Sequence, residues 1–156
     1  MQILKNLRII FYTILGSEIL MGAITLFFWK TKAFTPTIVR PELITNIVRL
    51  IYAFSAAIVV AVLIMKRKMF IRKKYVNLDE ESIIRAFSGT YILLGVLCES
   101  ISVFAILLFF LTGLLRASLI LIAISFFSTL SVFPFTELVK YHLEKIKELR
   151  DRHYPY

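Results

Sequence analysis

Four long apolar stretches dominate the chain and restrict it to one class of fold. They cover about residues 9–29, 43–65, 83–112 and 115–134. About 20 mostly apolar residues suffice to cross the roughly 30 Å of hydrocarbon in a bilayer. Because 59% of the 156 residues are hydrophobic and the mean hydropathy is +0.82, a soluble core of this size could not hide them. We therefore predict an all-α polytopic membrane protein, with four transmembrane helices in two hairpins occupying residues 1–135.

The distribution of Lys and Arg predicts the orientation of these helices. Two cations precede the first stretch, seven lie in or next to the loop 66–82, and five follow the last stretch, whereas the opposite face carries five. Cytoplasmic segments hold the excess of Lys and Arg. We therefore expect an integral protein of a prokaryotic inner membrane with both termini in the cytoplasm. The basic loop is expected to contact anionic lipid headgroups through Lys66, Arg67, Lys68, Arg72, Lys73 and Lys74.

Two acids interrupt the apolar stretches. Glu18 and Glu99 each stand as the single Asp, Glu, Lys or Arg near the middle of a stretch. An Asp, Lys or Arg at the centre of a spanning helix costs about 2.5 to 3.5 kcal/mol on insertion scales, and Glu should be comparable, so such a residue indicates a use. Burial favours the neutral acid, which could carry a proton or bind Na⁺. The alternative is that both acids only join helices by hydrogen bonds to serines such as Ser17, Ser100, Ser102, Ser125, Ser128 and Ser131.

The glycines of the same two stretches predict close helix contacts. Gly16 and Gly22 lie six residues apart, and so do Gly89 and Gly95. Small residues let membrane helices approach each other. Since acids half exposed to lipid would be shielded by neighbouring subunits, we also expect a homo-oligomer, with other membrane subunits as further candidate partners.

No enzymatic signature is present. His142 and His153 are the only histidines, and they lack the spacing of metal ligands. Cys98 is the only cysteine, and an apolar setting predicts an inert thiol. The chain has no Gly-rich phosphate loop or dinucleotide fingerprint. We therefore predict no catalytic residues, no metal and no cofactor, and we attribute the net charge of +9 to membrane flanks and not to nucleic-acid binding.

Two helix starts are expected outside the membrane. Asn77 is placed to cap the third helix, with Glu80 reaching back to it. After Pro134, residues 136–156 predict a cytoplasmic amphipathic helix and tail, with Thr136 as its cap. Its apolar stripe could pack on the middle loop, lie on headgroups or bundle with other copies. The stripe consists of Leu138, His142, Leu143, Ile146 and Leu149.

Around Glu99 the chain resembles the ion-binding helix of the proteolipid ring subunits of rotary F-type and V-type ATP synthases. In that family a small residue follows the acid, and an aromatic residue and a Gly or Ala come five and six positions later. Ser100, Phe104 and Ala105 fill these places. The resemblance implies a closed homo-oligomeric ring with Glu99 and Ser100 at the ion site. The chain is also similar to the small multidrug-resistance transporters, which have four helices and one Glu in the first, the place of Glu18.

These observations lead us to expect a homo-oligomeric, ring-forming membrane protein whose buried glutamates bind or carry protons or Na⁺. Two alternatives stay open at this stage. One is a non-catalytic structural or scaffold subunit of a larger membrane complex. The other is a small cation-coupled transporter of the multidrug type.

Overall fold

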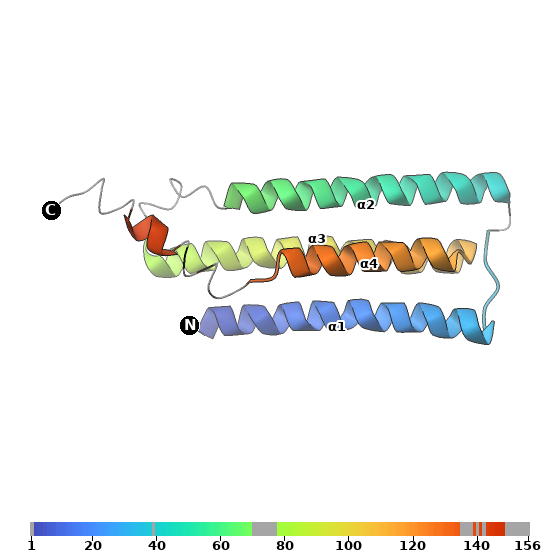
Figure 1. The fold of residues 1–156 in the computed structure, drawn as a ribbon, viewed down its shortest axis with the longest axis horizontal. Helices are drawn as coiled ribbons and strands as arrows, with labels where there is room; N and C mark the ends of the chain where they lie inside the picture. Colours follow the sequence, from blue (N-terminus) through green and yellow to red (C-terminus); the bar gives the residue numbers. More distant parts are fainter. Residues whose placement is uncertain are drawn as a thin grey trace.

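The structure, a computed structural model, describes residues 2–38, 40–69, 78–134, 139, 141 and 143–148. Four helices make up most of the described chain: α1 (Gln2–Thr31), α2 (Pro41–Met69), α3 (Glu80–Thr112) and α4 (Leu115–Ser131). They run alternately up and down the bundle (Figure 1). The described residues contain no strand, and the predicted all-helical class is confirmed.

Three of the helices, α1, α2 and α3, are long and apolar enough to cross a membrane. The fourth is shorter than predicted. Its 17 residues extend about 25 Å, less than the roughly 30 Å of a hydrocarbon core. The predicted end at residue 134 is wrong because the ring of Pro134 cannot follow a helical Leu130 carbonyl without a clash. The Leu130 carbonyl accepts the Phe133 N–H at 3.2 Å instead, and the chain leaves the helix after Ser131.

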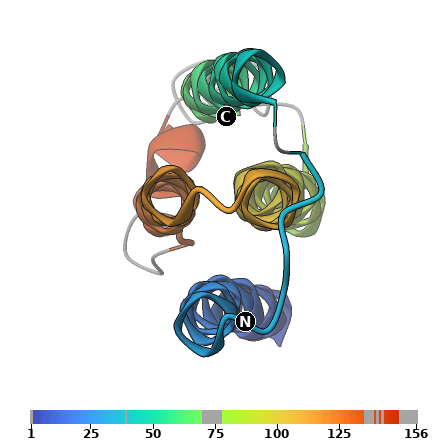
Figure 2. The same ribbon diagram turned by 90° about the vertical axis from the view of Figure 1, so that its right-hand side faces the viewer.

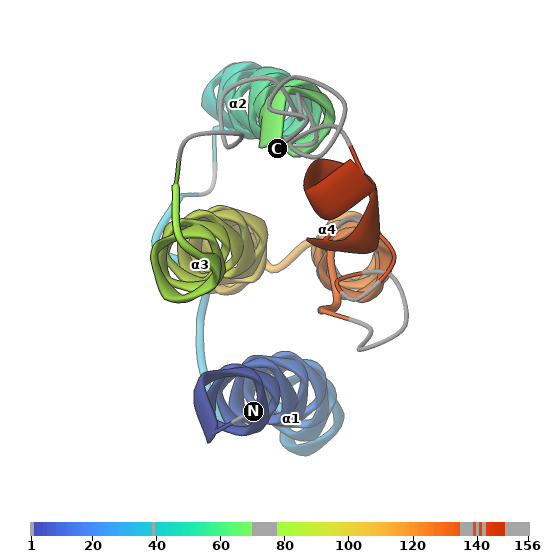
Figure 3. The same cartoon turned by 90° about the vertical axis from the view of Figure 1, so that its left-hand side faces the viewer.

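The helices form an elongated bundle with α3 and α4 in the middle. Seen along its axis, α1 and α2 lie on opposite sides of this central pair (Figures 2 and 3). We call the end that holds Gln2 the tail end, and the end that holds the α1–α2 connection the turn end. The described part of the tail, Val139, Tyr141 and residues 143–148, is helical and lies at the tail end (Figure 1).

The buried side chains fall into two clusters along the bundle. The cluster near the tail end includes Leu7, Phe11, Phe87, Tyr91 and Leu94, and the cluster toward the turn end includes Ile51, Ile101, Leu108 and Leu121. Phe11 meets Tyr91 edge to face, with ring centroids 6.4 Å apart. Large apolar side chains such as Phe127, which is 68% exposed, cover the outside. This distribution fits helices whose outer faces lie in lipid.

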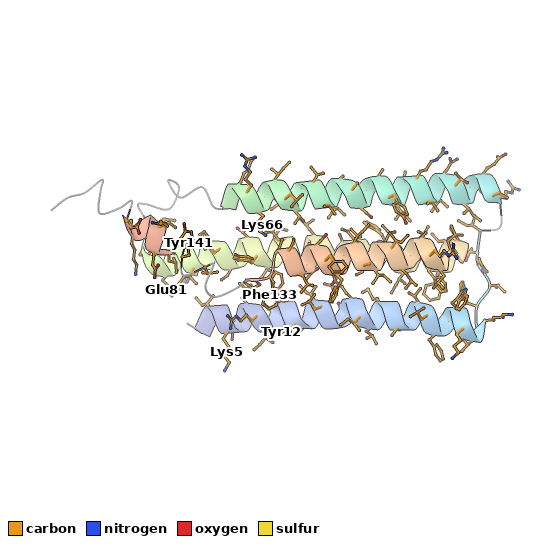
Figure 4. The ribbon with its side chains drawn as sticks, in the orientation of Figure 1. Lys5, Tyr12, Lys66, Glu81, Phe133 and Tyr141 are labelled. Atoms are coloured by element: carbon orange, nitrogen blue, oxygen red, sulfur yellow. The ribbon has the colours of Figure 1, made fainter. Side chains whose placement is uncertain are left out.

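The tail helix packs on its own bundle. Val139, Leu143 and Ile146 are buried in the tail-end cluster. Of the alternatives that the sequence left open for this stripe, none named the chain's own helices, so the partner is a finding of the structure. Leu138, His142 and Leu149 of the predicted stripe, and the predicted cap Thr136, lie outside the described residues. At the same end the rings of Tyr12 and Phe133 lie together, with centroids 5.3 Å apart (Figure 4).

Two hydrogen bonds tie α2 to α4. The Tyr52 hydroxyl donates to the Ala117 carbonyl at 3.2 Å, and the Lys66 ammonium donates to the Ser131 carbonyl. Ala117 lies in the first turn of α4, and Ser131 is its last residue. The negative end of the helix dipole, at Ser131, favours a cation such as Lys66. Each bond joins residues 65 positions apart, so α2 and α4 keep one register along the whole of α4.

The turn end is closed by tight packing around Gly113. This residue ends α3 at φ 71°, in the left-handed region that glycine adopts without cost, and an added Cβ would lie 2.8 Å from Pro36 Cγ. The α1–α2 connection is fixed here because Ile38 N–H donates to the Leu111 carbonyl at 2.9 Å. Phe34 packs against Phe109, with ring centroids 4.7 Å apart.

At the tail end, Asp79 caps α3. Its side chain accepts a hydrogen bond from the Ser82 N–H at 3.2 Å. The predicted cap, Asn77, lies outside the described residues. Hydrogen bonding from Ser82, through its side chain and its backbone N–H, lowers the pKa of Asp79. One turn further on, Glu81 and Arg85 form an exposed ion pair at 2.6 Å.

Acidification should loosen the start of α3. Because the pKa of Asp79 is lowered in the folded state, its stabilisation is present above the unfolded value of about 3.9 and is lost as the pH falls through the folded value. We expect the protection of the Ser82 and Ile83 amides, relative to their intrinsic exchange rate at each pH, to fall below about pH 4. Asp79→Ala should show this reduced protection at neutral pH as well. Asp79→Asn, which caps without titrating, should remove the pH dependence.

The two glycines of α3 should differ in their tolerance of a side chain. An added Cβ at Gly95 would meet Ile14 Cδ1 at 3.0 Å and Phe11 Cζ at 3.2 Å, whereas one at Gly89 has no neighbour within 4 Å. We expect Gly95→Leu to lower the free energy of unfolding by about 1 to 3 kcal/mol through overpacking. Gly89→Leu is the matched control and should be nearly neutral. Equal effects in a detergent unfolding titration would contradict this packing.

Candidate functional site

A cluster of polar side chains lies in the middle of the bundle, where α1, α3 and α4 meet. We call it the polar centre; it consists of Ser17, Glu18, Cys98, Glu99, Ser125 and Thr129. The adjacent residues Ser17 and Glu18 come from the middle of α1, and Cys98 and Glu99 come from the middle of α3. The two acids predicted from the sequence thus belong to one site.

Glu18 is completely enclosed by a single chain. It has 0% exposure, and its Oε1 accepts hydrogen bonds from the Ser125 hydroxyl at 2.6 Å and the Thr129 hydroxyl at 2.8 Å. Its Oε2 has no hydrogen-bond partner within the described part of the chain. Shielding of this acid therefore needs no neighbouring subunit, whereas the sequence predicted that other copies of the chain would shield it.

Glu99 is only half-buried, and it is held by α1. Its Oε1 accepts a hydrogen bond from the Ser17 hydroxyl at 2.6 Å. Neither Glu99 nor Glu18 forms an ion pair within the described residues. Within the part of the chain that the structure describes, two carboxyl groups therefore lie in the middle of the bundle without a cation paired to them.

The hydrogen bonds of the two serines follow the same pattern. The Ser125 hydroxyl lies 2.6 Å from Glu18 Oε1 and 2.6 Å from the Cys98 carbonyl oxygen. The Ser17 hydroxyl lies 2.6 Å from Glu99 Oε1 and 2.8 Å from the Ile14 carbonyl oxygen. A hydroxyl has one proton, and a carbonyl oxygen only accepts. The single proton of each serine therefore cannot serve both contacts. Both are satisfied when the serine donates to the carbonyl and a protonated carboxyl donates to the serine, which reverses the direction of the serine–carboxyl bond given above.

The polar centre depends on the spacing of polar residues in α4. Ser118, Ser125 and Thr129 are all buried, and they recur at intervals of seven and four, the spacing of one helix face. Ser125 is one of the six serines predicted from the sequence as partners of the acids, whereas Thr129 was not predicted. The intervals of seven and four residues could have identified Thr129, because Ser128 and Ser131 lie off the α4 face that carries Ser118 and Ser125.

The other predicted site residues lie apart from the polar centre. The Ser100 hydroxyl donates to the Leu97 carbonyl at 2.6 Å, within its own helix. Among the glycines, Gly95 lies against α1, and an added Cβ at Gly22 would lie 3.8 Å from Ile122 Cγ2 of α4. An added Cβ at Gly16 or Gly89 would have no neighbour within 4 Å.

The predicted headgroup cations divide between the described and undescribed chain. Lys66 binds the end of α4, and Arg67 and Lys68 are exposed at the tail end of α2. Arg72, Lys73 and Lys74 lie outside the described residues, as do His142 and His153. Cys98 is buried with a free thiol, and its carbonyl oxygen contributes to the polar centre.

Comparisons of the chain with protein-family models, with curated proteins and with solved structures find no match.

Removing the Ser125 hydroxyl should destabilise the bundle. Ser125→Ala leaves Glu18 Oε1 with Thr129 alone and leaves the Cys98 carbonyl without this donor. We expect the free energy of unfolding to fall by between about 0.6 kcal/mol, the average for one interhelical bond in a membrane, and about 3 kcal/mol, the upper cost of a buried unsatisfied group. Ser131→Ala is the control, since that exposed hydroxyl donates only to Ser128 of its own helix.

Proposed function

We propose that this chain is an integral membrane protein, with all four helices crossing the bilayer, whose polar centre binds and exchanges protons. The observation that carries the proposal is the pairing of each acid with a serine that also contacts a backbone carbonyl. This pattern suits two protonated carboxyl groups, because each serine can then donate to the carbonyl and accept from the carboxyl.

The contacts favour protons over Na⁺. The carboxyl and hydroxyl oxygens of the polar centre are 2.6 to 2.8 Å apart, the distance of a direct O–H···O hydrogen bond. A Na⁺ ion would have to replace these hydrogen bonds, whereas a proton forms them.

The two acids suit different steps of proton exchange. Glu99 is half-buried and is the acid that a proton from outside the bundle reaches first, whereas Glu18 is enclosed. When Glu99 loses its proton, Ser17 can turn its hydroxyl from the Ile14 carbonyl to the carboxylate and stabilise the charge. The same exchange of acceptors is open to Ser125 at Glu18. Each serine is thus able to serve both protonation states.

The competing function is a structural one, favoured by the complete enclosure of Glu18. Its bonds to Ser125 and Thr129 join α1 to α4, and the bond from Ser17 to Glu99 joins α1 to α3. A non-conducting subunit of a membrane complex could use the same contacts only for assembly.

Replacing each acid by the isosteric amide separates the two functions. Glu18→Gln and Glu99→Gln keep a hydrogen-bonding side chain but cannot release a proton. We expect proton flux into vesicles containing the purified protein, driven by an imposed potential and followed with an entrapped pH dye, to fall to the level of protein-free vesicles. Glu81→Gln, an exposed acid outside the polar centre, is the control and should conduct normally. Unchanged flux in both amide variants, with only stability reduced, would establish the structural function instead.

We also propose that copies of the chain assemble into a homo-oligomeric ring in which a neighbouring subunit covers Glu99. Because Glu99 remains half-buried in the isolated chain, a neighbouring subunit would complete its surroundings. Native mass spectrometry of the purified protein in mild detergent should then show a closed set of copies. A monomer that retains proton flux would refute the ring while leaving proton exchange intact.

A further inference from the structure

Three grooves are lined in part by the turn-end half of α1, and two of them are also lined by α4. We call this strip of the surface the α1–α4 seam. Two lie at the turn end, with volumes of about 540 and 410 Å³, and both are lined by Trp29 and Gly113. The third, about 250 Å³, lies further along the same seam between Ile19 and Gly22 of α1 and Leu119 of α4. Its lining residues include Glu18.

The turn-end grooves are positively charged. Lys30, Lys32 and Arg116 line them, and no acid does. These three cations are exposed, and within the described residues none of them forms an ion pair. The first turn of α4, which lines the second groove, adds to this potential because no side chain caps it. This part of the seam is complementary to an anionic group.

The third groove is apolar, and it is open because Gly22 has no side chain. An added Cβ at Gly22 would meet Ile122 Cγ2 at 3.8 Å, so any larger side chain would enter the space between the helices. Ile19, Leu119, Phe126 and Phe127 supply apolar walls. This part of the seam is complementary to a hydrocarbon chain.

The length of the seam matches one leaflet of a bilayer. Trp29 lies eleven residues along α1 from Glu18, which corresponds to about 16 Å of helix. Half of a hydrocarbon core is about 15 Å. A molecule that follows the seam from Trp29 to Glu18 would therefore extend from the membrane surface to its middle.

We propose that the α1–α4 seam is a binding site for one anionic phospholipid. Its phosphate contacts Lys30, Lys32 and Arg116, and one acyl chain lies in the apolar groove over Glu18. A soluble anion would leave the apolar groove empty. A zwitterionic phospholipid would bring its own cationic group next to Lys30, Lys32 and Arg116, which would repel it. The site is independent of proton exchange and requires only that α1 crosses the membrane.

The chain provides its own reporter for this site, because Trp29 is its single tryptophan and lines both turn-end grooves. The purified protein is placed in phosphatidylcholine vesicles that contain a small fraction of brominated phosphatidylglycerol or of brominated phosphatidylcholine. We expect the brominated phosphatidylglycerol to quench Trp29 fluorescence at a roughly tenfold lower mole fraction. Equal quenching by the two lipids in the unaltered chain would overturn the proposal.

Two matched pairs of variants localise the effect. Lys30→Gln/Arg116→Gln should bring the two lipids to similar quenching, whereas Arg40→Gln/Arg49→Gln, which removes the same charge on the α2 side, should keep the preference. Gly22→Leu should fill the apolar groove and raise the mole fraction needed several-fold. Gly16→Leu, on the same helix with no neighbour within 4 Å, should not. Equal effects within either pair would show general surface attraction and would refute the site.

Discussion

The arrangement of this bundle depends on the enclosure of one carboxyl group. A glutamate in the apolar middle of a membrane helix is tolerated only where other groups supply its hydrogen bonds. For Glu18 these come from Ser125 and Thr129, and the same Ser125 contacts α3 through the Cys98 carbonyl. Three helices must therefore meet at one depth and with these faces turned inward. The apolar clusters above and below the polar centre fill the remaining space without specifying which residues must be opposite one another.

Much of the fold follows from hydropathy alone. The apolar stretches predicted the helices, because backbone groups in lipid must be satisfied within a helix. They did not predict the helix ends: α1 begins at Gln2 and α3 at Glu80, because each helix continues from its apolar stretch into polar sequence. The end of α4 came earlier than the predicted residue 134 because of the clash between Pro134 and the Leu130 carbonyl, a local effect that an apolar window does not register.

The site was less predictable than the fold. Both acids were identified from their isolation in apolar sequence, but their unequal burial depends on what α4 places opposite them. Glu99 carried the resemblance to a known family, yet it is Glu18 that the chain encloses. The glycines differ for the same reason: the rotation of α3 decides that an added Cβ at Gly95 would meet Phe11, while one at Gly89 would have no neighbour within 4 Å. Helix rotation is a property of the assembled bundle and cannot be read from spacing within one helix.

The two bonds from α2 to α4 restrict how the bundle can move. Tyr52 and Lys66 donate hydrogen bonds to carbonyls in the first and last turns of α4, each 65 residues further along the chain. Sliding of α4 along its axis would therefore break both hydrogen bonds together. Rolling about its own axis, by contrast, needs only small adjustments of two flexible side chains. If α4 changes position during a working cycle, the cheaper motion is therefore a roll, which would swing Ser125 and Thr129 away from Glu18 while leaving the helix at its original height.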